Sequence, residues 1–421
     1  MARIIVEGGV SLRGTVTVSG AKNAALPIMA ATLLSDGPSV LKRVPVLRDI
    51  ETMGEILRGL GVVTERMSDG AIHCEVRDPE TVLAPYDLVS TMRGSICVLG
   101  PLLARRKRAK VSLPGGCVLG VRPIDLHLKG LRALGARIEI EHGYLVAEAE
   151  ELRGAEIYLG GQFGSTVLGT ANVLMAATLA RGTTVIDYAA CEPEIQDLAN
   201  FLVKMGAKID GIGTPRLVVE GVTSLRGAEH SVIADRIEAG TFLIASAITR
   251  GDVLVDQCRG DHLTAVIDKL NDVGVRVERK NGTIRVNATG RLKATELTTH
   301  TYPGLPTDLQ AQFMALLSVA DGMSIVSEKI YPDRFMHAAE LNRMGADIRK
   351  DGANAIVQGV SNLSGAEVMA SDLRASAALV LAGLVARGKT EVHRVYHIDR
   401  GYERIERKLQ DLGARIWRED D

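Results

Sequence analysis

Aromatic residues are scarce in this chain of 421 residues: Phe, Trp and Tyr make up 3% of it, and only one residue is Trp. Basic and acidic residues almost balance, with 50 Lys and Arg against 51 Asp and Glu, and the formal net charge is −1. Proteins that bind nucleic acid usually combine a basic surface with aromatic side chains that stack on bases. The composition therefore indicates that nucleic acid is not a partner.

Long apolar runs are missing as well. The most apolar stretches are about a dozen residues long, whereas a helix that spans a membrane needs ~20. The first residues, "MARIIVEGG", lack the apolar core of a secretory signal. We therefore expect a cytoplasmic protein without a membrane partner.

Cysteine is rare, and the common catalytic signatures are absent. The five cysteines are an odd number without C-x-x-C spacing, which argues against a disulfide framework and against a zinc site. The chain contains no G-x-G-x-x-G after a strand, no G-x-x-x-x-G-K-[ST], no H-E-x-x-H and no G-x-S-x-G. Standard nucleotide-binding, metalloprotease and serine-hydrolase sites are thereby excluded.

What the sequence does contain is a repeat of about 70 residues. In each copy an amphipathic helix pattern ends at a glycine and is followed by a short strand pattern, which predicts a helix C-cap. The copies are "GLGV" (59–62), "LGARI" (134–138), "MGAKI" (205–209), "VGVRV" (273–277), "MGADI" (344–348) and "LGARI" (412–416).

Each copy also has a second helix pattern upstream that is apolar on every face, as in "AALPIMAATLL" or "ASAALVLAGLVA". Such helices must be surrounded by protein. Because six of them cannot easily share one centre, we predict two α/β domains, each with three apolar helices inside and small sheets covering them. The first domain is expected at 22–232 and the second at 1–21 and 233–421. Since "LRG" at Leu12 precedes the first buried helix, we expect the N-terminal strand to complete the last sheet of the second domain.

Polar residues gather where the buried helices are expected to start. They are Lys22, Asn23, Arg93, Ser165, Thr166, Asp235, Arg236, Glu238, Asp308, Asp372 and Arg374. Helix N-termini attract anions, so two such faces across a cleft would suit a highly phosphorylated substrate. Asp235, Ser165 and Thr166 are explained equally well as helix caps. Cations are disfavoured at a positive helix end, so Lys22, Arg93 and Arg374 indicate a bound anion.

The stretch "LPGGCVLGVRPIDLH" (113–127) places Cys117 directly after two glycines. The glycines permit backbone conformations that other residues avoid, and Pro123 opens a predicted helix. We expect His127 on the surface of that helix. A Gly-Gly-Cys seen alone is usually an incidental turn.

Seven motifs in order resemble the UDP-N-acetylglucosamine 1-carboxyvinyltransferase family of enolpyruvyl transferases, nearly from end to end. They are "SGAKNAALPIMAATLL", "LPGGCVLGVRPIDLH", "CEPEIQDLANFL", "YPGLPTDLQAQF", "RFMHAAELNRMGA", "SDLRASAALVLAGL" and "HIDRGYERIERKL". The resemblance implies a two-domain inside-out α/β barrel with six repeats, three per domain. It also implies transfer of the enolpyruvyl group of phosphoenolpyruvate to the 3-hydroxyl of UDP-N-acetylglucosamine, with release of phosphate, in the first committed step of peptidoglycan synthesis. Neither a metal nor an organic cofactor is implied, and no obligate protein partner is evident.

The resemblance implies roles for individual residues. Phosphoenolpyruvate needs fixed cations for its carboxylate and phosphate, and the matching residues are Lys22, Arg122 and Arg400, with Arg93 and Arg374 nearby. Asp308 matches the family's base and Cys117 its acid. Fosfomycin is expected to alkylate Cys117. The positions matching contacts to the sugar nucleotide are Asn23, Arg122, Pro123, Ile124, Asp125, Leu126, Asp308 and Ile330, and Arg334 and Asp372 complete the substrate-binding set.

One segment departs from the family pattern. Many members have a "SVGAT"-like turn where this chain has "GSTVLGT" after an extra "GGQF", so contact of residues 160–170 with the uridine nucleotide stays open. Two other functions also stay open. The sister enzyme 3-phosphoshikimate 1-carboxyvinyltransferase shares fold and donor, although the Cys117 loop and "RPIDLH" argue against it. A non-catalytic scaffold that binds sugar nucleotides would be favoured by loss of Asp308, Cys117 or the cations, but all are present.

Overall fold

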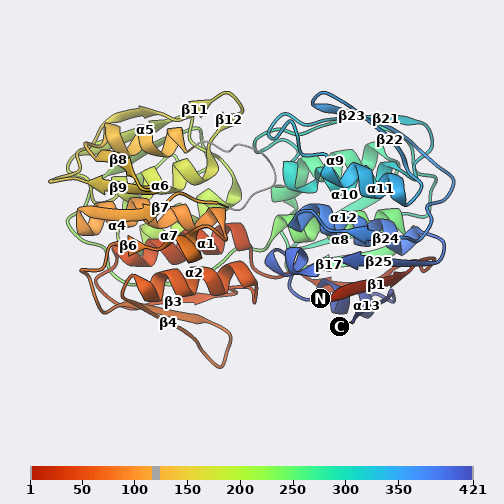
Figure 1. Cartoon of the computed structure of the whole chain (residues 1–421), viewed down its shortest axis with the longest axis horizontal. Coiled ribbons are helices and arrows are strands. Elements are labelled where there is room, and N and C mark those ends of the chain that lie inside the picture. The colour runs from red at the N-terminus through yellow and green to blue at the C-terminus, as the bar shows by residue number, and fades with distance from the viewer. Residues whose placement is uncertain (1, 116–123, 420–421) are drawn as a thin grey trace. The chain divides into compact units, whose positions relative to one another are not determined.

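The computed structural model describes residues 2–115 and 124–419 (Figure 1). By their contacts these residues divide into two units, one of 2–19 with 234–419 and one of 20–115 with 124–233. Each unit has its own hydrophobic core. The domain boundaries given above remain a prediction.

In the unit of residues 20–233, three four-stranded sheets accompany three buried helices. The first sheet contains β3 (Ser39–Lys42), β4 (Val62–Arg66), β5 (Ile72–Val76) and β16 (Glu229–Ser231). The second contains β6 (Leu83–Ala84), β7 (Arg108–Ser112), β8 (Arg137–Glu141) and β9 (Tyr144–Glu148). The third contains β10 (Glu156–Tyr158), β13 (Thr183–Asp187), β14 (Lys208–Asp210) and β15 (Arg216–Glu220), and β11 (Gly160–Gly161) and β12 (Gly164–Ser165) form a separate hairpin.

The helices of this unit are of the two predicted kinds. The buried ones are α1 (Lys22–Ala31) with η1 (Thr32–Leu34), α4 (Leu99–Arg106) after the 3-10 helix η2 (Arg93–Val98), and α6 (Val167–Ala177). The others are α2 (Arg48–Gly59), α3 (Tyr86–Val89), α5 (Asp125–Ala133) and α7 (Pro193–Met205). The amphipathic members α2, α5 and α7 keep polar residues on an exposed face, as their sequence pattern predicts.

The unit of 2–19 and 234–419 repeats this arrangement. Its sheets are formed by β17 (Asp252–Asp256), β18 (Arg276–Lys280), β19 (Thr283–Asn287) and β2 (Arg13–Thr17); by β20 (Leu297–Thr298), β21 (Met323–Ser327), β22 (Asp347–Asp351) and β23 (Asn354–Gln358); and by β24 (Glu367–Met369), β25 (Lys389–His393), β1 (Arg3–Glu7) and β26 (Arg415–Glu419). The buried helices are α8 (Arg236–Ile248), α10 (Gln310–Leu317) after η4 (Thr307–Leu309), and α12 (Leu373–Val385). The remaining helices are η3 (Gly260–Leu263), α9 (Thr264–Asp272), α11 (Met336–Arg343), η5 (Val395–Arg400) and α13 (Ile405–Asp411).

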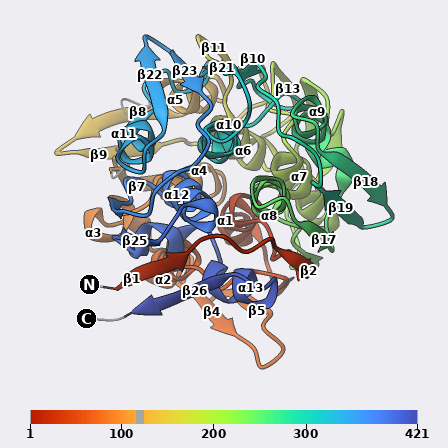
Figure 2. The same ribbon diagram turned by 90° about the vertical axis from the view of Figure 1, so that its right-hand side faces the viewer.

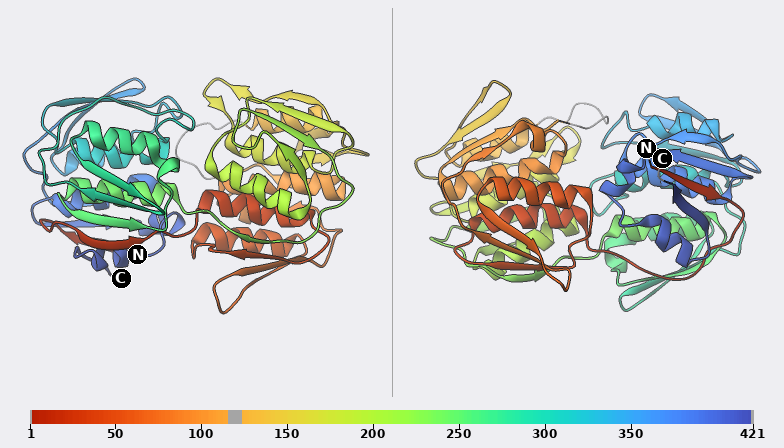
Figure 3. Two further views of the ribbon diagram at one scale, coloured as in Figure 1. Left: turned by 180° about the vertical axis from the view of Figure 1, so that it is seen from behind. Right: turned by 60° about the horizontal axis from the view of Figure 1, so that its bottom comes forward.

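The N-terminal strand completes the last sheet of this unit, as predicted. β1 pairs antiparallel with both β25 and β26, so the first and last strands of the chain lie side by side (Figures 2 and 3). β2 then pairs in parallel with β17. Ile4, Ile5 and Val6 of β1 are fully buried, so this short segment belongs to the core of the unit.

The glycine of each repeat has the backbone conformation that the sequence predicts. All have positive φ, a region open to Gly at little cost. These angles are Gly61 +78°, Gly135 +99°, Gly206 +110°, Gly274 +92°, Gly345 +89° and Gly413 +94°. The predicted fold class, two α/β units of three repeats with apolar helices inside, is confirmed. Within the described part of the chain, no helix is both long and apolar enough to cross a membrane.

Candidate active site

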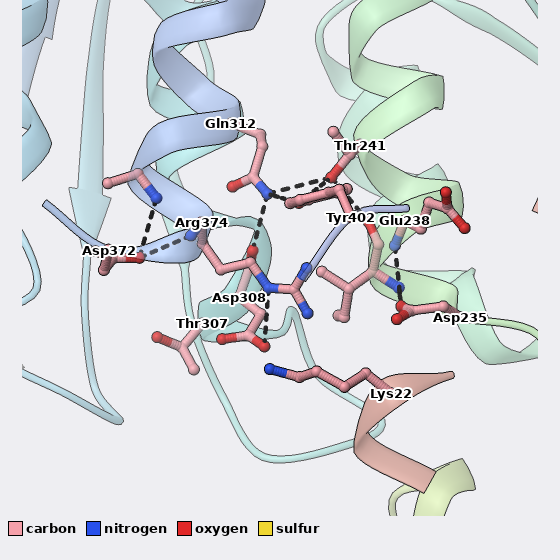
Figure 4. A network of polar contacts seen from close by, with 12 residues as sticks. Lys22, Asp235, Glu238, Thr241, Thr307, Asp308, Gln312, Asp372, Arg374 and Tyr402 are labelled. Carbon is pink, nitrogen blue, oxygen red and sulfur yellow. Dashed lines mark hydrogen bonds and ion pairs between the residues drawn. The ribbon is translucent and has the colours of Figure 1, made fainter. Parts of the chain in front are cut away.

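Buried polar residues meet where α8, α10 and α12 begin (Figure 4). Asp308 lies in η4, the single turn that leads into α10. Arg334 Nη1 donates to Asp308 Oδ1 at 2.8 Å, and Arg374 Nε donates to Asp308 Oδ2 at 3.3 Å. Both arginine side chains are almost fully buried, whereas 26% of the Asp308 side chain is exposed. Two buried arginines therefore hold a carboxylate that is itself partly exposed.

The two arginines determine what Asp308 can do. Opposite charges at this distance favour the ionised carboxylate over the carboxylic acid. Each carboxylate oxygen has more than one lone-pair direction, so an oxygen that accepts from an arginine can accept another proton donor. The arrangement suits a carboxylate that takes a proton from a ligand hydroxyl.

A second layer of contacts holds the backbone of Asp308. Gln312 Nε2 donates to the Asp308 carbonyl at 3.0 Å and to the Tyr402 hydroxyl at 3.1 Å. The Tyr402 hydroxyl is 2.8 Å from Thr241 Oγ1, and the Arg374 guanidinium lies 5.1 Å from the centre of the Tyr402 ring. Burial raises the pKa of Tyr402, so its hydroxyl stays protonated at neutral pH. The sequence did not single out Gln312 and Tyr402, although both lie within the matched motifs, nor Thr241, which lies in none of them.

Asp372 has a role in the fold as well as a charge beside the site. Its Oδ1 accepts from the backbone N–H groups of Arg374 and Ala375 at 2.8 and 3.1 Å, which caps α12. The same oxygen is 3.9 Å from Arg334 Nη2. Burial lowers the pKa of Arg334, but the carboxylates of Asp308 and Asp372 outweigh it and the net shift is upward. Arg334 therefore stays charged despite its burial.

Two other predicted residues belong to the same unit. Ile330 follows β21 and is half-buried, and its N–H donates to Glu328 Oε1 at 2.8 Å. Arg400 is the last residue of η5 and is also half-buried. Burial, and then the charge of Arg400, lower the pKa of His397. His397 is therefore neutral at physiological pH.

In the unit of 20–233, Lys22 is the first residue of α1 and Asn23 the second. Lys22 Nζ is 3.0 Å from Asp49 Oδ2, and both residues are buried. Asp49 lies in the first turn of α2 and was not predicted, because one Asp in a helix start resembles a capping residue. From the sequence, a bound anion was expected beside Lys22 and Arg374. In the structure the carboxylates of Asp49 and Asp308 offset their charge, so the position of these cations does not by itself require a ligand.

Arg93 begins η2 and lies close to His127 of α5. The prediction that His127 lies on a helix surface was wrong, because His127 is 4% exposed. Asn172 Oδ1 accepts from the Gly100 N–H, so its Nδ2 is the donor to His127 Nδ1 at 3.0 Å. Burial, and then Arg93, lower the pKa of His127 to about 3. The neutral His127 thus links α5 to α6 through Asn172, close to Arg93.

The remaining predicted residues of this unit surround the start of α5. Ile124 precedes the helix, and Asp125 and Leu126 are its first residues. A Cβ placed on Gly161 would be 3.0 Å from Leu126 Cδ1, so the β11–β12 hairpin lies against Leu126. Thr166 Oγ1 accepts from the Gly169 N–H at 3.2 Å and caps α6. Cys117, Arg122 and Pro123 lie outside the described residues.

Comparison with known proteins identifies the family of this chain. Residues 6–409 match the family described as EPSP synthase (3-phosphoshikimate 1-carboxyvinyltransferase). The chain belongs to this family of enolpyruvyl transferases. Among curated relatives, the UDP-N-acetylglucosamine 1-carboxyvinyltransferase of Methylacidiphilum infernorum (isolate V4) is 55% identical over 99% of both chains. The protein of the same name from Myxococcus xanthus (strain DK1622) is 53% identical over 100% of both.

Solved structures of enolpyruvyl transferases share the fold. The enolpyruvyl transferase NikO from Streptomyces tendae superposes with a TM-score of 0.89 at 25% identity over 99% of both chains. The EPSP synthase from Acinetobacter baumannii superposes with a TM-score of 0.74 at 19% identity over 100% of both, which shows the fold alone.

Proposed function

We propose that this enolpyruvyl transferase moves the enolpyruvyl group of phosphoenolpyruvate to the 3-hydroxyl of UDP-N-acetylglucosamine. The observation that carries the proposal is Asp308, a partly exposed carboxylate held by two buried arginines. The names of the relatives, which match along the whole chain, support this choice of acceptor. We place the reaction in the cytoplasm, as the first committed step of peptidoglycan synthesis.

The reaction needs a base and an acid. Asp308 takes the proton of the 3-hydroxyl while that oxygen bonds to C2 of phosphoenolpyruvate, and Cys117 donates a proton to the methylene carbon C3. The Cys117 thiolate then takes a proton back from C3, which restores the double bond as the C2–O bond to phosphate breaks, and the proton on Asp308 passes to the departing phosphate. The products are the enolpyruvyl ether and inorganic phosphate, and no water is consumed.

Phosphoenolpyruvate carries up to three negative charges, and the proposal assigns cations to it. One N–H of the Lys22 ammonium group donates to Asp49, and the others can donate to an oxygen of the substrate. Arg122 and Arg400 act with Lys22, and Arg93 and Arg374 lie near the substrate. Cations that are fixed in place before the substrate arrives stabilise charge that develops in the transition state.

The sugar nucleotide is assigned to Asn23, to residues 122–126, to Asp308 and to Ile330. Arg334, which holds Asp308, and Asp372, which lies beside Arg334, complete this set. Because the β11–β12 hairpin lies against Leu126, we extend this set to the hairpin. Its glycines leave room for a ligand close to the backbone. Replacement of Ser165 by Leu should then weaken binding of UDP-N-acetylglucosamine more than binding of phosphoenolpyruvate.

A second candidate acceptor is shikimate 3-phosphate, because the matched family is described by that activity. Phosphate release from phosphoenolpyruvate, measured with each acceptor in turn, separates the two. We expect release with UDP-N-acetylglucosamine and none above background with shikimate 3-phosphate. Phosphate release with shikimate 3-phosphate and none with UDP-N-acetylglucosamine would mean that shikimate 3-phosphate is the acceptor.

A further inference from the structure

Glu328, the first residue after β21, is a buried carboxylate that the proposed mechanism does not use. It is 0% exposed. Its Oε1 accepts from Thr299 Oγ1 at 2.7 Å and from the N–H groups of Ile330 and Tyr331 at 2.8 and 3.0 Å. Its Oε2 accepts from Thr307 Oγ1 at 2.9 Å. Four donors therefore converge on one side chain.

Glu328 forms no ion pair with any residue of the described chain, so its four hydrogen bonds are what stabilises it there. Two backbone donors and two hydroxyls are enough to hold a carboxylate without a counter-ion. Burial of such a group without these bonds would be costly. The arrangement thus fixes the two segments that supply the donors, 299–307 and 330–331, relative to each other.

Thr307 links this cluster to Asp308. A hydroxyl has one proton, and Thr307 donates it to Glu328, so only its lone pairs face Arg334. Arg334 Nη1 donates to Thr307 Oγ1 at 3.0 Å and to Asp308 Oδ1 at 2.8 Å. The same arginine nitrogen is therefore held by Thr307 on one side and by the candidate base on the other.

We propose that Glu328 is a positioning residue for the transfer reaction: through Thr307 it orients Arg334 on Asp308, and through the backbone of Ile330 it aligns the predicted sugar-nucleotide contact with the same base. The inference rests on the proposed function, because it assumes that Asp308 acts on a ligand hydroxyl. The sequence alone did not single out Glu328, which is separated along the chain from the residues that it joins.

A purely structural role predicts something different. Thr299 and Thr307 both donate a hydroxyl to Glu328, but only Thr307 also accepts from Arg334. Thr299→Val therefore removes the bond to Glu328 and the one that Thr299 Oγ1 accepts from the Lys329 N–H, but it leaves the link to Asp308 intact. Thr307→Val breaks that link. The two substitutions have the same change of shape and form a matched pair.

The test compares wild type, Thr307→Val, Thr299→Val and Glu328→Gln for phosphate release across pH. In Thr307→Val and Glu328→Gln, Arg334 is held less firmly and stabilises the ionised form of Asp308 less. The acidic limb of the kcat–pH profile should therefore move to higher pH. We expect kcat to fall about tenfold in Thr307→Val and Glu328→Gln, with a smaller change in the KM for phosphoenolpyruvate. Thr299→Val should keep the wild-type limb and most of kcat.

Several charged groups face this site and must be unchanged in the comparison. Asp308 is faced by Arg334 and Arg374. Arg334 is in turn faced by Asp372 and Tyr331, and Arg374 by Asp235 and Tyr402. The buried His337 lies near Arg334 and Asp372. All of them are common to the four proteins, so a limb that moves only in Thr307→Val and Glu328→Gln reports on the link through Thr307.

The double variant Thr307→Val with Glu328→Gln adds a second readout. If both act through one link, the double variant should be no slower than the slower single variant. Multiplied losses, or equal effects of Thr307→Val and Thr299→Val, would overturn the inference while wild-type turnover upheld the proposed function. Wild-type protein without turnover would overturn the proposed function, and the inference with it.

Discussion

At the scale of the residue, the account depends on Asp308. Asp308→Ala should lower kcat by about 100-fold or more, the usual contribution of a general base, and leave most of the affinity for UDP-N-acetylglucosamine. Arg400→Ala should instead raise the KM for phosphoenolpyruvate, since it removes a cation assigned to that substrate. Steady-state kinetics and calorimetric binding check both. Asp333→Asn, whose side chain is 82% exposed in the same unit, is the control. Near-normal turnover of Asp308→Ala would mean that another group is the base.

A second residue-scale prediction concerns the thiols. Burial raises the pKa of Cys74 and Cys97 to about 12 and that of Cys258 to about 11, and it also raises the pKa of Cys191. Because the thiolate is the nucleophile, these cysteines should be inert at neutral pH. We expect fosfomycin to alkylate Cys117 and stop turnover.

Peptide mapping after fosfomycin treatment checks this prediction. Cys117→Asp should stay active and resist the inhibitor, because it keeps a group that can donate a proton, while Cys117→Ala should lose most turnover. Labelling at any of the other four cysteines, or full activity of Cys117→Ala, would contradict the assigned role.

The residues of the site were predictable only in part. Lys22, Arg93, Asp308, Asp372 and Arg374 stand at or beside helix starts, as their motifs indicate. Their partners were not predictable, because Asp49 and Tyr402 contact Lys22 and Arg374 from other elements of the same units. A single polar residue in a sequence does not reveal whether its side chain caps a helix or forms an ion pair. Tertiary packing makes that distinction.

At the scale of the element, the periodic patterns were sufficient for the helices and their ends. The apolar and amphipathic helices of each repeat follow from their periodicity, and the glycine after each amphipathic helix follows from its C-cap position. The 3-10 turns η2 and η4, which carry Arg93 and Asp308, have no comparable sequence pattern. The buried position of His127 depends on the packing of α5 against α6, which its own helix pattern does not contain.

Two glycines near helix ends of one unit should respond in opposite ways to replacement by alanine. Gly206 has φ +110°, where an L side chain is strained, so Gly206→Ala should lower the free energy of unfolding by about 1 kcal/mol. Gly59 is the exposed last residue of α2 and has no atom within 4 Å of an added Cβ, so Gly59→Ala should raise the free energy of unfolding by about 0.5 kcal/mol. Thermal unfolding of the two variants measures the difference. Equal shifts would contradict the C-cap assignment.

At the scale of the whole molecule, the repeat and the all-apolar helices were sufficient to predict the fold class. The reason is physical: a helix without a polar face must be enclosed, and a repeated unit encloses it in the same way each time. The proposal assigns substrate contacts to both units, with Lys22 and Asn23 in one and Asp308 and Ile330 in the other.

Binding of UDP-N-acetylglucosamine should therefore slow amide hydrogen exchange in both units. Mass spectrometry of peptides should show added protection around 22–28 and 124–130 and also around 305–312 and 328–334. Peptides from β18 and β19 serve as the internal control, since no substrate contact is assigned to them. Protection confined to one unit would remove the other unit's residues from the sugar-nucleotide site.

The most direct test of the account is the identity of the product. Wild-type protein and Asp308→Asn are incubated with phosphoenolpyruvate and UDP-N-acetylglucosamine, and the sugar nucleotide is analysed by mass spectrometry and NMR. The account predicts a vinyl ether on the 3-oxygen in amounts equal to the phosphate released, formed about 100-fold or more slowly by Asp308→Asn. Unmodified sugar nucleotide from active wild-type protein, a vinyl ether at another oxygen, or equal rates for the two proteins would contradict it.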